Sequence, residues 1–221
     1  MQMQFILAST PEPAGKYVAD VISAQLAGNR SVLWLVSGGS AVSVAVVAAK
    51  HLVGHDLSRL TVSLIDERYG PVGHADSNWR QLADAGFMPA GATRHPVLDG
   101  SSDAKTTEVF NEFLHIQFAR NDFHLGLLGI GPDGHTSGIL PHSPAVTAPE
   151  LVASYDGGAF RRITTTPHAL SHLSEAVVYA VGSGKWPVLD RLETDLPVAE
   201  QPAQALKSVP KLTIFTDRPE Q

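Results

Sequence analysis

The sequence predicts an α/β fold with a mostly parallel sheet that is covered by helices on both faces. Two observations lead to this prediction. Short apolar runs rich in β-branched residues recur along the chain, and segments with a helical repeat of apolar residues lie between them. Strands that alternate with helices are typical of a parallel sheet, because each connecting helix packs on one of its faces.

The expected elements follow one another in a Rossmann-like, three-layer order. Six apolar runs have the length and composition of buried strands: residues 4–8, 32–36, 60–65, 123–130, 176–181 and 211–216. Five segments between them carry a helical pattern: residues 13–26, 41–52, 77–85, 103–119 and 185–192. Two weaker extended segments, residues 151–155 and 161–165, are expected to add an edge strand or a small lobe.

The composition is that of an ordinary folded domain, and we expect residues 1–221 to form one. The chain is 43% hydrophobic and its net charge of −6 comes from interspersed charges, so no basic face for nucleic acid or a membrane surface is expected. There is no cysteine, which excludes disulfides, thiolate catalysis and cysteine-based metal sites. Without a basic leader or a long apolar run, the sequence predicts a cytoplasmic protein. The Pro- and Gly-rich segments 86–100 and 141–149 are interpreted as loops.

Polar clusters follow four of the expected strands at the point where each strand ends. They are Ser37-Gly-Gly-Ser40, Asp66-Glu-Arg68, Gly131-Pro-Asp-Gly-His135 and Gly182-Ser-Gly-Lys185. Because the carboxyl ends of parallel strands meet at one edge of a sheet, where α/β proteins bind ligands, the clusters predict a single site. For Asp66-Glu-Arg68 the alternative is a surface ion-pair turn of little energetic weight.

Both glycine turns suit an anion, since glycines let the backbone approach a ligand and amides at a helix start attract negative charge. The turn from Ser37 to Ser40 lacks the ending of a nucleotide P-loop, and a plain turn capped by serine is its alternative. Lys185 at a helix start opposes the helix dipole unless an anion lies near; otherwise it is a solvated lysine. Arg161-Arg162 either contacts phosphate or forms an exposed pair.

The segment Gly129-Ile-Gly-Pro-Asp-Gly-His-Thr136 is the strongest indication of chemistry. It joins Asp133 to His135, and an imidazole can move protons near neutral pH. Its glycine spacing matches a dinucleotide fingerprint, but Pro141 and Pro144 follow too soon for the required helix. The sequence has no His-Glu-x-x-His metal motif, so no metal is expected. It also has no Gly-x-Ser-x-Gly elbow, the turn that carries a nucleophilic serine. Ser137 as a nucleophile is a disfavoured alternative.

Taken in order, these motifs resemble those of the 6-phosphogluconolactonase family, within the wider glucosamine-6-phosphate isomerase/deaminase-like group. The similarity covers most of the chain. It comprises Ser37-Gly-Gly-Ser40, Asp66-Glu-Arg68 through Pro71 to Ser77-Asn78-Trp79, Gly129 to Thr136 with Leu140-Pro141, Arg162-Ile-Thr164 and Gly182-Ser-Gly-Lys185. Asp-Gly-His-Thr together with Asp-Glu-Arg is specific, whereas the short glycine turns are not.

The resemblance implies a cofactor-free hydrolase of 6-phosphoglucono-1,5-lactone in the pentose phosphate pathway, with an α/β core of the sugar-phosphate isomerase/lactonase type. It implies that His135 is the general base for water and that Arg68 stabilises charge on the lactone oxygen. Asp66 and Asp133 would hold the histidine, the water or the sugar hydroxyls. The residues implied in phosphate binding are Ser37, Gly38, Gly39, Ser40, Arg162 and Lys185. The expected partner is a small molecule, and the expected state is a monomer or small homo-oligomer.

Three departures from the family pattern bear on the substrate. The chain is somewhat short, it has Ala41-Val42 where the family usually has Thr-Pro, and Ser137-Gly-Ile-Leu-Pro141 replaces Ala-Ser-Leu-Phe-Pro. One alternative is an amino-sugar phosphate deaminase/isomerase; those enzymes carry a glutamate shortly after Asp-Gly-His, and residues 136–145 contain no acidic residue. The other is a non-catalytic sugar-phosphate-binding module, which would not need Asp66, Asp133 and His135.

Overall fold

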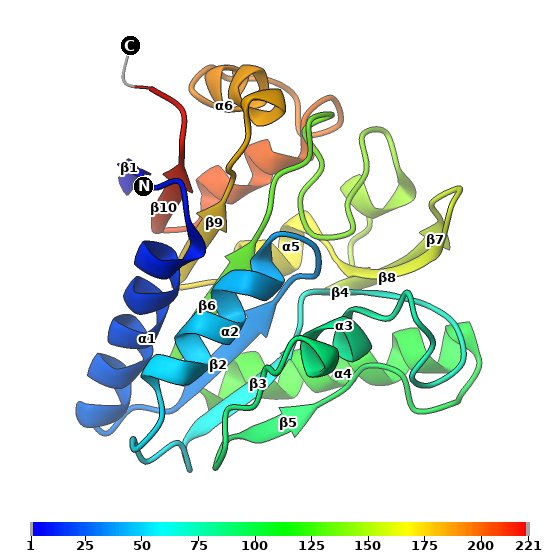
Figure 1. Ribbon diagram of the computed structural model, residues 1–221. Helices are drawn as coiled ribbons and strands as arrows, with labels where there is room; N and C mark the ends of the chain where they lie inside the picture. Colours follow the sequence, from blue (N-terminus) through cyan, green and yellow to red (C-terminus); the bar gives the residue numbers. More distant parts are fainter. Residues whose placement is uncertain (1, 220–221) are drawn as a thin grey trace.

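A seven-stranded parallel sheet forms the centre of the computed structural model, which describes residues 2–219 (Figure 1). The strand order is β1-β10-β9-β6-β2-β3-β5, and every neighbouring pair is parallel. The strands are β1 (Gln2–Leu7), β2 (Val32–Val36), β3 (Leu60–Leu64), β5 (Thr93–His95), β6 (Phe123–Leu128), β9 (Glu175–Tyr179) and β10 (Lys211–Thr216). The predicted parallel sheet is confirmed, with all six expected strands in place.

Helices cover both faces, as predicted. The connections through α1 (Pro11–Ala27), α2 (Ala41–His51) and α3 (Asn78–Asp84) step across the sheet in one direction, and those through α4 (Asp103–Arg120) and α5 (Pro167–Leu170) step back. Because such crossovers are right-handed, the reversal puts the second set on the opposite face. Figure 1 shows α1 and α2 in front of the sheet and α4 behind it.

Short helices complete the chain: the 3₁₀ helices η1 (Pro144–Val146), η2 (Ser183–Lys185) and η3 (Pro202–Ser208), and the α-helix α6 (Trp186–Leu192).

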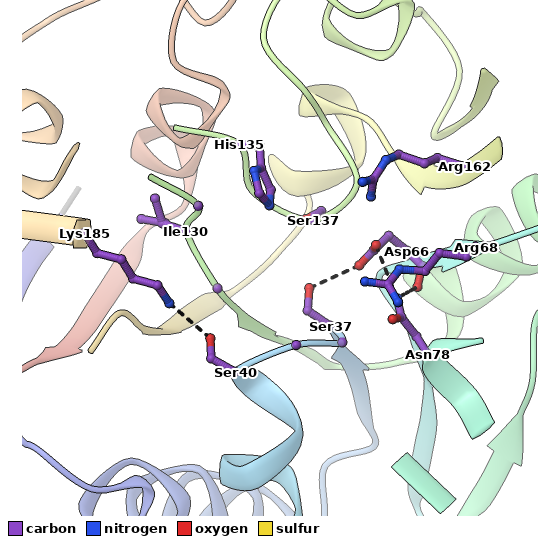
Figure 2. Close-up of a pocket in the computed structure, with 14 residues that line it drawn as sticks. Ser37, Ser40, Asp66, Arg68, Asn78, Ile130, His135, Ser137, Arg162 and Lys185 are labelled. Carbon is purple, nitrogen blue, oxygen red and sulfur yellow. Dashed lines mark hydrogen bonds between the residues drawn. The ribbon is translucent and has the colours of Figure 1, made fainter. Parts of the chain in front are cut away.

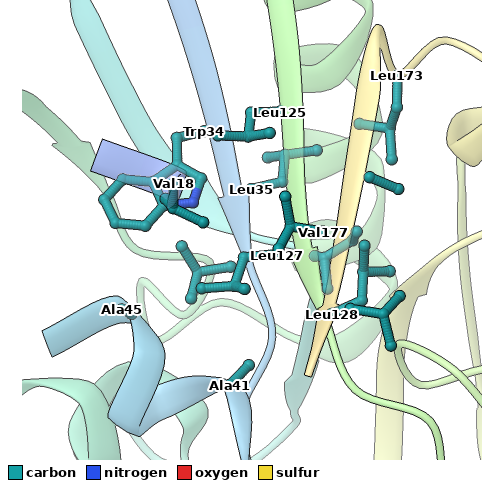
Figure 3. Packing of buried hydrophobic residues seen from close by; sticks show 14 of the residues in the cluster. Val18, Trp34, Leu35, Ala41, Ala45, Leu125, Leu127, Leu128, Leu173 and Val177 are labelled. Atoms are coloured by element: carbon teal, nitrogen blue, oxygen red, sulfur yellow. The ribbon is translucent and has the colours of Figure 1, made fainter. Parts of the chain in front are cut away.

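The core runs along both faces of β2 and β6. Every residue of β2 is buried, and Figure 3 shows Trp34 packed near Val18 of α1, with Leu125 and Leu127 on the neighbouring strand β6. A strand covered on both faces needs an unbroken apolar run, which is why this one was evident from sequence. Burial of each large side chain contributes about 1.5–3 kcal/mol.

A second, three-stranded sheet lies beyond the carboxyl end of β3. It is antiparallel and has the order β4 (Asp66–Arg68), β8 (Arg161–Thr165), β7 (Val152–Asp156). The two weak extended segments thus form the expected small lobe, but the third strand was not predicted. Asp66-Glu-Arg68 is not a surface turn, because Asp66 pairs with Thr164 and Arg68 with Arg162.

Two segments expected to be loops contain short elements. The three-residue strand β5 lies within residues 86–100 and forms through its register with β3, in which Thr61 pairs with Thr93. Its sequence, Thr-Arg-His, has no apolar alternation, so only the pairing makes it a strand. Residues 141–149 likewise contain the 3₁₀ helix η1.

Candidate functional site

A pocket of about 310 Å³ opens at the carboxyl edge of the parallel sheet, beyond the neighbouring strands β2 and β6 (Figure 2). The connections leave in opposite directions here, which makes this point the topological switch of the sheet, where α/β proteins bind ligands. All predicted site residues except Asp133 line it. The lining residues are Ser37, Gly38, Gly39, Ser40, Asp66, Arg68, Asn78, Gly129, Ile130, Gly131, His135, Ser137, Arg162 and Lys185.

The first glycine turn joins β2 to α2 and needs both of its glycines. Gly39 has a φ of +61°, which glycine adopts without strain, and a Cβ on Gly38 would lie 2.0 Å from Asn78 Oδ1. Ser40 does not cap α2 with its side chain. Its hydroxyl donates to the Tyr179 carbonyl at 3.3 Å and accepts from Lys185 Nζ at 3.3 Å. The two glycine turns therefore meet at one side of the pocket.

Lys185 is half-buried and held in place by its own turn, so it is not a freely solvated lysine. Gly182 begins this turn with a φ of +109°. The Asp217 carboxylate accepts hydrogen bonds from the Gly182 N–H at 2.9 Å and from the Trp186 indole at 3.0 Å. Burial lowers the pKa of Lys185, against the opposing effect of the Asp217 charge.

The His135 imidazole is oriented by Asp133. Asp133 Oδ1 lies 2.6 Å from His135 Nδ1 and 3.2 Å from the His135 backbone nitrogen. Burial raises the pKa of Asp133, but the hydrogen bonds and charge of His135 outweigh it, and the net shift is downward. Because a carboxylate only accepts hydrogen bonds, Nδ1 carries the proton and Nε2 of the neutral ring is left as a base.

The glycines around His135 make room for the ring and the turn. A Cβ on Gly131 would lie 2.2 Å from the imidazole, and Gly134 has a φ of +89° beside Gln201. The chain then folds back through bridges from Thr136 to Ile130 and Ile139. No dinucleotide-type helix follows these glycines; the next helical element is the short η1.

Asp66 is buried beneath the pocket at 5% exposure. It accepts a hydrogen bond from the Ser37 hydroxyl at 3.3 Å and one from the Asn78 amide at 3.3 Å. Burial raises the pKa of Asp66, although the charges of Arg68 and Arg162 act in the other direction. A carboxylate with raised pKa beside two guanidinium groups is typical of a functional site.

Three cations line the pocket without a carboxylate partner. Within residues 2–219, Arg68, Arg162 and Lys185 form no ion pair within 4.0 Å, although Arg161 next to them pairs with Asp103. Arg68 donates to the Asp76 carbonyl at 2.9 Å, and the buried Nε atoms of Arg68 and Arg162 have no partner. Charge without a partner around a cavity favours an anionic ligand.

Several residues that matter here were not assigned a role from sequence. Asn78, Gly129, Ile130 and Gly131 line the pocket, and Ser137 was considered only as a nucleophile. Glu67 is fully buried and accepts hydrogen bonds from the backbone of Arg68 and from the start of α3. A charged residue after a strand carries no sequence signal for such burial; its adjacency to the Ser77-Asn78 helix start is visible only in three dimensions.

In the described part of the chain, no three metal-ligating side chains are grouped as they would be around an ion. Over the same residues, none of the helices combines the length and apolar character needed to cross a bilayer.

Known proteins share both the sequence pattern and the fold. A family model described as glucosamine-6-phosphate isomerases/6-phosphogluconolactonase matches residues 8–214. A 6-phosphogluconolactonase of Rhizobium meliloti is 26% identical over 219 residues, covering 93% of this chain and 94% of that protein. One from Rattus norvegicus is 28% identical, covering 86% and 83%. The crystal structure of a 6-phosphogluconolactonase from Shewanella baltica has the same fold, with a TM-score of 0.83, 21% identity and 97% of each chain covered. The chain belongs to the glucosamine-6-phosphate isomerase/6-phosphogluconolactonase family.

Proposed function

We propose that this protein hydrolyses 6-phosphoglucono-1,5-lactone to 6-phosphogluconate, a step of the pentose phosphate pathway. Relatives over nearly the whole chain carry the name 6-phosphogluconolactonase, which supports this assignment. The observation that carries it is a histidine oriented by a carboxylate at 2.6 Å, in a pocket whose three cations form no ion pair within residues 2–219. A general base and an anion site are what hydrolysis of a phosphorylated lactone needs.

The substrate phosphate is assigned to the glycine turn from Ser37 through Gly38 and Gly39 to Ser40. Lys185 donates to Ser40 of this turn at 3.3 Å, and Arg162 lines the same pocket on the side away from Lys185 (Figure 2). Backbone amides at the start of α2 add to the attraction. A phosphate far from the reacting carbon contributes binding energy that positions the ring for attack.

In the proposed reaction, His135 Nε2 takes a proton from a water molecule as its oxygen attacks the lactone carbonyl carbon. Asp133 holds the imidazole and stabilises its positive charge, and Arg68 stabilises the carbonyl oxygen as it becomes negative. The ring C–O bond then breaks, and the ring oxygen takes the proton back from His135. Asp66, which contacts Ser37 and Asn78, is assigned to the water or a sugar hydroxyl.

The proposed chemistry also bears on the cofactor and on the deaminase alternative. A lactone is already a reactive ester, so no covalent nucleophile or cofactor is required. Deaminase chemistry would need an acid after Asp-Gly-His, and residues 136–145 supply none. We also infer that residues 1–221 act as one domain, on a small molecule, in the cytoplasm; whether the protein is a monomer or a small homo-oligomer stays a prediction.

The test is hydrolysis of freshly generated lactone, corrected for spontaneous opening, by wild type, His135→Ala and the control His115→Ala on the exposed side of α4. We expect wild type and the control to accelerate the reaction equally, and His135→Ala to lose about 10²–10⁴-fold, the usual contribution of a general base. No acceleration by wild type would overturn the lactonase assignment. Full activity in His135→Ala would remove the histidine from the mechanism alone.

A further inference from the structure

Ser137 lines the pocket and carries a hydroxyl that has no hydrogen-bond partner within residues 2–219. The side chain lines the cavity, the residue is 9% exposed, and its Oγ atom is buried without any hydrogen-bond partner. Leaving a buried hydroxyl unpaired is costly, so such groups in a binding cavity normally find a hydrogen-bond partner in what binds there.

The backbone of Ser137 is also held in an unfavourable conformation. Its φ is +54°, a region that residues other than glycine rarely adopt and that clusters at functional sites. The turn is fixed from both sides. Gly138 N–H donates to Thr164 Oγ1 at 3.0 Å, and the Tyr155 hydroxyl donates to the Gly138 carbonyl. The neighbouring strands β7 and β8 therefore fix the position of Ser137 in the wall of the cavity.

The hydroxyl cannot be moved one residue along the chain. A Cβ on Gly138 would lie 2.9 Å from Thr164 Cβ and 3.2 Å from Asp66 Cβ, which leaves no room for a serine. The packing therefore excludes a side chain at 138 and leaves 137 as the position in this turn that supplies a hydroxyl.

We propose that Ser137 Oγ hydrogen-bonds an oxygen of the sugar portion of the substrate and so contributes to its selection; this rests on the proposed function. The hydroxyl is not a nucleophile, because no base is hydrogen-bonded to it. Figure 2 shows Ser137 directly beside His135, whereas Lys185 and Ser40 lie across the pocket. Since the reacting carbon has to lie within reach of His135, Ser137 is placed to contact the sugar rather than the phosphate.

The experiment compares the affinities of two probes, 6-phosphogluconate and inorganic phosphate, by calorimetry. The variants are Ser137→Ala, Ser137→Gly and, as a matched control, Ser143→Ala, whose Oγ is also buried and unpaired but lies outside the pocket. For both Ser137 variants we expect about tenfold weaker binding of 6-phosphogluconate, the worth of one hydrogen bond, and unchanged binding of phosphate. The control should bind both probes as wild type does.

Ser137→Gly separates binding from folding. Glycine adopts a positive φ without strain, so this variant should melt at or above the wild-type temperature while still binding the sugar phosphate weakly. The proposal for Ser137 would be overturned by an unchanged 6-phosphogluconate affinity in both variants, or by an equal loss of affinity for both probes. The lactonase assignment would still stand in either case if the wild type hydrolyses the lactone. A wild type that binds phosphate but neither binds 6-phosphogluconate nor opens the lactone would overturn both.

Discussion

The pocket lies between two sheets that differ in almost every respect. The parallel sheet contributes apolar strands, and its loops supply the glycine turns, His135 and Lys185. In the antiparallel sheet, charged residues of the strands themselves line the site: Asp66 and Arg68 from β4, and Arg162 from β8. The first sheet is stable through burial of apolar area, whereas the second places charges where burial is costly.

That difference shows how a site with conflicting charges is held together. Asp66 and Glu67 are both buried, and burial raises the pKa of each carboxyl group. The cost of burying Glu67 is offset by the hydrogen bonds that its carboxylate accepts from the start of α3. The cost of burying Asp66 is offset only in part, and Asp66 lines the cavity. Adjacent acids in one three-residue strand thus have separate tasks, Glu67 in anchoring the small sheet and Asp66 in the site.

The largest expected effect comes from removing the anchor of the small sheet. Glu67→Ala would leave the N–H groups of Arg68 and Asn78 and the Ser77 hydroxyl without their acceptor. Since each unpaired buried group costs about 1–3 kcal/mol, we expect a loss of about 3–5 kcal/mol in unfolding free energy, measured with urea. The exposed Glu108→Ala on α4 should stay within about 0.5 kcal/mol of wild type. A loss below about 1 kcal/mol for Glu67→Ala would mean that water replaces this carboxylate.

A smaller effect is expected for Asp66→Asn, which should lower the activity and raise the stability at pH 7. We expect kcat/KM for the lactone to fall about 100-fold, within the range of a charged group acting at the reacting centre. The folded protein holds the Asp66 proton more tightly than the unfolded chain does, so ionisation lowers stability as pH rises from the ordinary value of 3.8 through the raised pKa.

Asparagine does not ionise, and the Asp66→Asn variant should therefore be more stable than wild type at pH 7 and about equal to it near pH 3.5. Urea unfolding at both pH values measures this, with Asp195→Asn on the surface as the control. If the variant were less stable at pH 7, attraction to Arg68 and Arg162 would outweigh the cost of burial.

The smallest effect concerns the parallel-sheet side of the pocket. Asp217 follows β10 and holds the turn of Lys185 through Gly182 and Trp186. Asp217→Ala should leave kcat near wild type and raise KM about fivefold, because loss of hydrogen bonds to a charged acceptor loosens the lysine that we propose to bind phosphate. The surface variant Asp195→Ala should leave both constants unchanged. A fall in kcat with an unaltered KM would assign Asp217 to the reaction step instead.

The centre of the parallel sheet could be predicted from sequence because its strands are buried on both faces. The continuous apolar run Val32–Val36 is recognisable from the sequence alone, and the order of the strands along the chain puts the following loops at one edge. For this reason the glycine turns, Asp66, Arg68, His135 and Lys185 were expected at one site, and Arg162 was added through the family resemblance; the structure brings them to one pocket. Their chemical roles stay proposals.

The small antiparallel sheet was harder to predict from sequence, because its strands are defined by their pairing with each other and not by a pattern of apolar residues. Asp66–Arg68 becomes a strand only through its contact with Arg161–Thr165, almost a hundred residues away, and Thr93–His95 only through β3. The burial of Glu67 against α3 and the unpaired hydroxyl of Ser137 arise in the same way.

The sequence by itself determined the layers, the strand-end clusters and the residue types of the site, since these follow from local periodicity and chain order. Only the tertiary structure decided which acid is structural, and which cations and which hydroxyl around the cavity have no partner within residues 2–219. Burial and hydrogen-bond partners are properties of neighbours in space, which the order of residues does not specify.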